Sequence, residues 1–127
     1  MKSLGRFLLA FSAILLVIGA WIHTSAFNKM SATVAKSDLI PSAAKSLRIL
    51  WLEDSVVLLV LAIAFAVIAA WPSTATKWVI VLIAVIPAAT AALVYYFVGT
   101  FIAGHILLAA AIAAIVGGLQ YPAGKQV

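Results

Sequence analysis

The sequence predicts an all-α integral membrane protein, folded as an antiparallel four-helix bundle with up-down-up-down topology. Of its 127 residues, 67% are hydrophobic and only 9% are charged, which leaves too little polar surface to cover a water-soluble globule of this size. The apolar residues also fall into four runs, each close to the roughly 20 residues that cross a hydrocarbon core about 30 Å thick. We therefore expect one transmembrane domain over residues 1–127.

The four predicted spans are separated by short polar or turn-forming segments. They cover residues 7–27, 50–70, 78–97 and 100–118. The first apolar run is longer than the hydrophobic region of a signal peptide, so we assign it to a span. The turn between the last two spans is so short that they must be antiparallel neighbours. Residues 28–49 are predicted as a polar loop that includes an extension of the second helix, because Pro41 suits a first helical turn.

Tryptophans and basic residues mark the two predicted membrane faces. Trp21 and Trp51 belong to one face, and Trp71 and Trp78 to the other, as in an aromatic belt. The basic residues divide equally, with Lys2, Arg6, Lys77 and Lys125 on the side of the termini and Lys29, Lys36, Lys45 and Arg48 on the other. The cations before the first span favour cytoplasmic termini in a bacterial inner membrane.

The expected partners are the lipid bilayer and other membrane proteins. The basic residues are scattered rather than interleaved with aromatic residues in one stripe, so no nucleic acid is expected as a partner. The apolar outer surfaces would suit contact with other membrane subunits or with further copies of the chain. The chain contains no cysteine, which excludes disulfides and thiolate metal sites.

Successive spans run in opposite directions, so one end of each span lies at the same membrane face. The four ends at this face carry most of the ionisable and phenolic side chains found near helix ends. They are His23, Glu53, Asp54, Tyr95, Tyr96 and His105. His23 lies about four residues inside the end of its span, and His105 about five residues inside the start of its own. At about 1.5 Å per residue, the two imidazoles therefore lie at nearly the same depth.

Helical periodicity predicts which of these side chains face the bundle interior. His23 shares a stripe with Ser12 and Gly19, and His105 shares one with small residues, Ala109, Ala113 and Gly117. Small residues spaced by four allow membrane helices to approach closely. We therefore expect both histidines to face inward and to meet, since the first and last helices of such a bundle can be neighbours.

The two acids of the second span are predicted to face different ways, because adjacent helical positions differ by about 100°. Asp54 lies on one stripe with large apolar residues, Leu58, Leu61, Phe65 and Ile68, which we expect to face lipid. Asp54 would then be an acid near the start of a helix, where the helix dipole favours it. Glu53 is expected to point inward, toward the histidines.

The first functional hypothesis is a metal or acid–base site. Two imidazoles and a carboxylate, His23, His105 and Glu53, form a recognised ligand set for a transition metal ion. The same groups could act on a lipophilic substrate, with Glu53 and His105 as catalytic proton donor and acceptor. Tyr95, Tyr96, Thr24 and Asp54 would hydrogen-bond to these groups and orient them.

Two alternatives remain open from the sequence. A b-type haem could be held between His23 and His105, because small neighbours would admit a flat macrocycle. The chain could equally be a structural or accessory subunit of a membrane complex without its own chemistry, in which Glu53 pairs with Lys45 or Arg48. The four-span layout resembles that of small bacterial membrane proteins of unassigned function, including the DoxX-like proteins.

Overall fold

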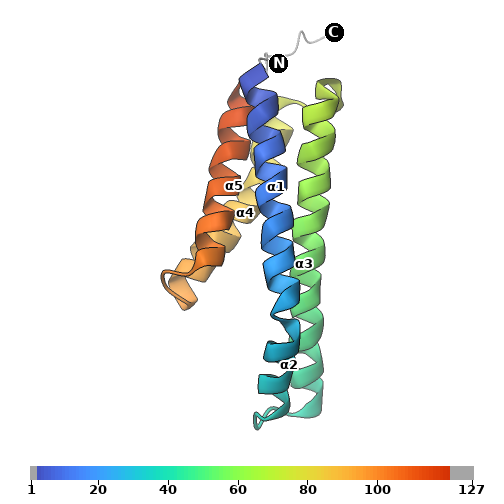
Figure 1. Cartoon of the computed structure of the whole chain (residues 1–127), viewed down its shortest axis with the longest axis vertical. Helices are drawn as coiled ribbons and strands as arrows, with labels where there is room; N and C mark the ends of the chain where they lie inside the picture. Colours follow the sequence, from blue (N-terminus) through green and yellow to red (C-terminus); the bar gives the residue numbers. More distant parts are fainter. Residues whose placement is uncertain (1–2, 121–127) are drawn as a thin grey trace.

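The computed structural model describes residues 3–120, all of them in helices or short connections (Figure 1). The elements are α1 (Ser3–Ser25), α2 (Phe27–Ala35), α3 (Pro41–Ala70), the 3₁₀ helix η1 (Pro72–Thr74), α4 (Lys77–Phe97) and α5 (Ile102–Leu119). Four helical segments are long and apolar enough to cross a membrane, namely α1 with α2, α3, α4 and α5. This confirms the predicted all-α bundle. Lys2 and Lys125 lie outside the described residues.

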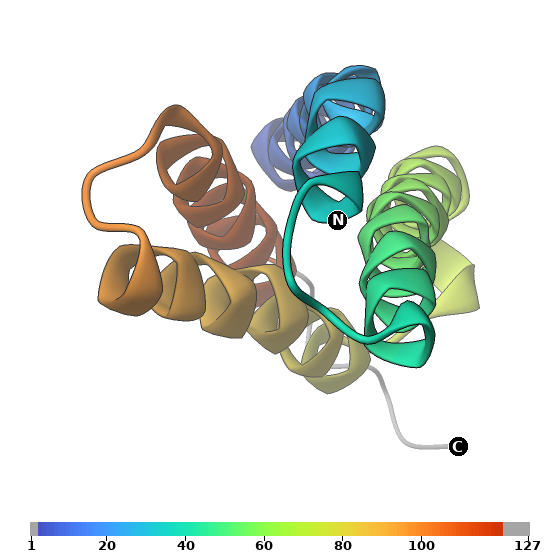
Figure 2. The ribbon, with the colours of Figure 1, turned by 90° about the horizontal axis from the view of Figure 1, so that it is seen from below.

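The helices form two arms that meet along α1. Helix α1 packs against both α3 and α5, and α4 packs against α5, whereas α3 and α4 contact each other little. Figure 2 shows the same order around the bundle. We call α1 with α3 the first arm and α4 with α5 the second arm. The arms diverge toward the end of the molecule that carries α2 (Figure 1).

Much of the stretch predicted as a polar loop is helical. Backbone bonds continue past the end of α1, with Ala26 N–H donating to Ile22 O at 3.2 Å and Met30 N–H to Ala26 O at 3.0 Å. The non-helical connection is therefore confined to residues 36–40, and Pro41 occupies the first turn of α3. With 30 residues, α3 is about 45 Å long. It is therefore about 15 Å longer than a hydrocarbon core of about 30 Å is thick.

The connection between α4 and α5 is a tight turn, as the sequence predicts. Helix α4 ends at Phe97, and α5 begins at Ile102. Gly99 in this turn has φ +83°, a backbone conformation that favours glycine because other L-residues carry a steric penalty there. The turn lies at the end of the molecule where the two arms diverge (Figure 1).

The core is built from small residues on one helix against larger residues on another. Leu16 and Phe65 are fully buried at the centre of the first arm. A Cβ added at Gly19 of α1 would lie 3.8 Å from Leu58 of α3, and one added at Gly117 of α5 would lie 3.0 Å from the backbone oxygen of Gly5 of α1. Such close backbone approach is how membrane helices gain van der Waals contact, because burial from lipid adds little.

One buried hydrogen bond joins α1 to α5 through the hydroxyl of Ser12. Ser12 Oγ donates to Ala110 O at 2.8 Å. We expect Ser12→Ala to lower the free energy of unfolding by about 0.6 kcal/mol, the average for interhelical hydrogen bonds in membranes. Unfolding by sodium dodecyl sulfate in mixed micelles, followed by circular dichroism, would measure it. Ser25→Ala is the control, since exposed Ser25 bonds only within its own helix, and an equal loss there would contradict the prediction.

Candidate functional site

His23 and Trp51 form a reciprocal contact between the end of α1 and α3. The two rings are stacked, with centroids 4.2 Å apart and an interplanar angle of 16°. Trp51 Nε1 donates to His23 O at 2.9 Å, and His23 Nε2 lies 3.0 Å from Trp51 O. The contact fixes the imidazole ring near the end of α1, against α3.

This geometry defines the tautomer of His23. A carbonyl oxygen only accepts hydrogen bonds, so Nε2 of His23 carries a proton and donates it to Trp51 O. The same Nε2 lies 3.6 Å from Asp54 Oδ2, with the His23 and Asp54 side chains 24% and 39% exposed. Nδ1 of His23 has no partner among the described residues. Nδ1 is therefore the ring atom that can accept a hydrogen bond or a proton from a ligand.

The His23–Asp54 pair lines a cleft between the two arms. The cleft has a volume of about 240 Å³, slightly below the lower end of about 300 Å³ for small-molecule sites. Its opposite wall comes from the second arm and the α4–α5 turn, and is apolar apart from Thr90; it includes Val94, Phe101, Ile106 and Leu107. The hydroxyl of Thr90 is bonded to its own helix. An ionisable wall thus faces an apolar one.

The prediction for the two acids of α3 is wrong, because their facing is reversed. Glu53 is exposed and makes no hydrogen bond or ion pair with any described residue, so it does not pair with Lys45 or Arg48. Asp54 instead points toward His23. The stripe below Asp54 that was expected to face lipid is buried: Leu58, Leu61, Phe65 and Ile68. Leu58 lies opposite Gly19 of α1, where an added Cβ would be 3.8 Å from it.

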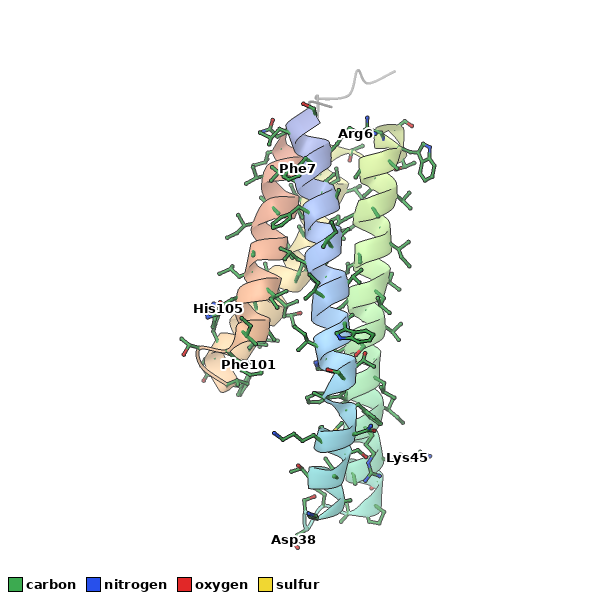
Figure 3. The ribbon with its side chains drawn as sticks, in the orientation of Figure 1. Arg6, Phe7, Asp38, Lys45, Phe101 and His105 are labelled. Atoms are coloured by element: carbon green, nitrogen blue, oxygen red, sulfur yellow. The ribbon has the colours of Figure 1, made fainter. Side chains whose placement is uncertain are left out.

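The prediction that His105 faces the bundle interior is also wrong. His105 is exposed and its Nδ1 lies 2.7 Å from Tyr95 Oη of α4. Figure 3 shows His105 on the side of α5 that faces away from α1. The buried face of α5 is instead the one carrying Gly104, Leu107 and Ala110. Tyr96, which the sequence predicts at the same site, is 81% exposed.

The residues do not fit the predicted metal or haem sites. His23 is paired with α3, whereas His105 is paired with Tyr95 on the outside of the second arm. Within residues 3–120, no group of three or more His, Asp or Glu side chains is placed to hold a metal ion. Thr24, expected to orient the site, is exposed. The structure brings together His23 and Asp54, and leaves Glu53 and His105 apart from them.

Trp51 is the site residue that sequence reasoning missed. It was assigned only to the membrane interface, yet its carbonyl fixes the His23 tautomer and its ring supports the imidazole. The signal was available in the spacing, since Trp51, Asp54 and Leu58 lie three and four residues apart on one helical face.

Comparisons of the chain with protein-family models, curated proteins and solved structures each found no match.

Proposed function

We propose that this integral membrane protein binds a lipophilic molecule that carries a hydroxyl group, in the cleft between its two arms. The observation that carries the proposal is the His23–Asp54 pair on one wall of a cleft whose opposite wall is apolar apart from Thr90. The hydroxyl would donate to the free Nδ1 of His23, while the rest of the molecule contacts the apolar wall. Ionisable side chains at membrane depth are costly and mark functional sites.

The same pair supports acid–base chemistry on such a hydroxyl. When Nδ1 accepts the ligand's proton, the resulting imidazolium keeps its Nε2 proton directed at Trp51 O and lies beside the Asp54 carboxylate. An adjacent carboxylate stabilises an imidazolium and holds its orientation, as in the histidine–aspartate pairs of hydrolases. A phenol suits this site best, because it is the more acidic kind of hydroxyl.

Histidine NMR tests the proposal, because the chain has only two histidines. We expect 4-nonylphenol, added to the protein in micelles, to shift the Nδ1 signal of His23 saturably, while nonylbenzene, which lacks the hydroxyl, does not. Asp54→Asn should weaken the apparent affinity about tenfold, the value of a hydrogen bond supported by a charged group. His105 serves as the internal reference and should not respond.

Glu53→Gln is the matched control for Asp54→Asn. Both replacements remove one carboxylate charge from adjacent positions of α3, but only Asp54 lies beside His23. The affinity for 4-nonylphenol should therefore stay at the wild-type value in Glu53→Gln. Equal effects of the two replacements, or equal shifts caused by nonylphenol and nonylbenzene, would refute the proposal.

A role as a subunit of a membrane complex is the second candidate. It is favoured by the sparse contact between α3 and α4, which leaves one side of the bundle open to a partner helix. We further propose a bacterial inner membrane with cytoplasmic termini, on the basis of Lys2 and Arg6, which precede the first predicted span. The resemblance in layout to DoxX-like proteins stays a prediction.

A further inference from the structure

A second groove follows the seam between α1 and α3 from the opposite membrane face. It has a volume of about 740 Å³, within the range of about 300–1,000 Å³ for small-molecule sites. Alanines on both helices line it, and their small side chains leave the space open. Every lining residue except Arg6 is apolar. Arg6 lies at its outer end, next to the end of α3 (Figure 3). This groove shares no lining residue with the cleft that contains His23.

The groove has the length of one membrane leaflet. On α1 it extends from Arg6 to Ile18, which corresponds to about 18 Å of helix. One leaflet of the hydrocarbon core is about 15 Å thick. A linear apolar chain that starts at the headgroup level beside Arg6 would therefore end near the bilayer midplane, where the groove also ends.

The guanidinium of Arg6 is held in place but keeps donors free. Its Nε donates to Ala69 O at 2.8 Å, and its Nη2 donates to Ala70 O at 3.4 Å. Arginine has five N–H donors, and those of Nη1 have no partner among the described residues. The two carbonyls thus orient a planar donor group of the kind that binds phosphate.

No carboxylate side chain neutralises Arg6. The chain has three acidic residues, and all of them, Asp38, Glu53 and Asp54, lie toward the other end of the molecule, as Asp38 illustrates in Figure 3. A second copy in the same orientation would bring another Arg6 and Lys77 to this level, which is repulsive. Lipid phosphates lie at this level and carry the complementary charge.

We propose that this groove binds one anionic phospholipid, with an acyl chain along the α1–α3 seam and the phosphate on Arg6. Basic pockets between membrane helices recognise phospholipid headgroups in this way. The proposal is independent of the ligand proposed for the cleft, because it concerns the other membrane face and other residues.

Native mass spectrometry of the full chain in detergent tests this proposal with three lipids that have the same acyl chains. They are phosphatidylglycerol, phosphatidylcholine and diacylglycerol. We expect one phosphatidylglycerol to bind about tenfold more tightly than diacylglycerol, which lacks the phosphate, with phosphatidylcholine between them. Arg6→Gln should abolish these differences, whereas Lys77→Gln, which removes a charge at the same face but outside the groove, should preserve them.

Filling the groove gives a test that leaves Arg6 intact. Ala66→Leu should weaken the binding of all three lipids, and Ala92→Leu, on an exposed part of α4, should not. Inorganic phosphate should fail to displace phosphatidylglycerol. The proposal is overturned if Arg6→Gln keeps the preference, if Ala66→Leu binds lipid normally, if inorganic phosphate competes, or if the groove mutants change a dimer population instead.

Discussion

Replacing Gly117 by leucine is expected to lower the free energy of unfolding by about 3 kcal/mol, the upper part of the range for overpacked interfaces. A Cβ at this position would lie 3.0 Å from the backbone oxygen of Gly5 and 3.2 Å from Leu9 Cγ. Backbone cannot move aside as a flexible side chain can, so the added leucine must separate α1 from α5. That contact joins the two arms, and its loss should also remove the cleft between them.

Gly19→Ala is the matched control for Gly117→Leu. Gly19, on α1, is buried like Gly117 on α5, but its added Cβ would meet Ile106 and Leu58 only at 3.8 Å, which is ordinary van der Waals contact. We expect unchanged or slightly higher stability, because alanine favours helix more than glycine does. Detergent unfolding followed by circular dichroism would compare both variants with the wild type. A stable Gly117→Leu protein would show that α1 and α5 are not held by close backbone contact.

The number, order and boundaries of the membrane helices could be largely predicted because the bilayer imposes length and composition on each span. Helix α2 was missed for a related reason. Asn28, Lys29 and Ser31 are too polar for a membrane span, and hydropathy therefore ended the first helix before them. Helix formation needs only a continuous backbone without breakers, and residues 27–35 contain neither glycine nor proline. The helix can thus continue into the polar region.

The facing of α3 and α5 could not be derived in the same way. In a bilayer, a large apolar side chain is equally soluble in lipid and in the core, so hydrophobicity does not select the buried face. In α3, Leu58 is buried because Gly19 lies opposite it, and that pairing requires knowledge of the helix contacts. Helix α5 carries small residues on nearly every side. The stripe that contained His105 was therefore only one of several equally good packing faces.

Replacing Trp51 by alanine is expected to lower the free energy of unfolding by about 3 kcal/mol, as for other large aromatic truncations. The replacement removes the stack on His23 and the bond from Nε1 to His23 O, which together join the end of α1 to α3. Trp51→Phe keeps an aromatic ring beside the imidazole and loses only the hydrogen bond. It should therefore cost about 1 kcal/mol.

Trp21→Ala provides the control, because Trp21 lies two residues before His23 but is 76% exposed. Its effect should remain within about 0.5 kcal/mol, as for surface substitutions. The three variants also separate stability from binding. Since the Trp51 ring supports the His23 imidazole at the cleft wall, 4-nonylphenol should bind Trp51→Phe nearly as well as wild type and Trp51→Ala poorly. If Trp51→Ala bound the phenol normally while unfolding more easily, the stack would serve the fold alone and His23 would need no support to meet a ligand.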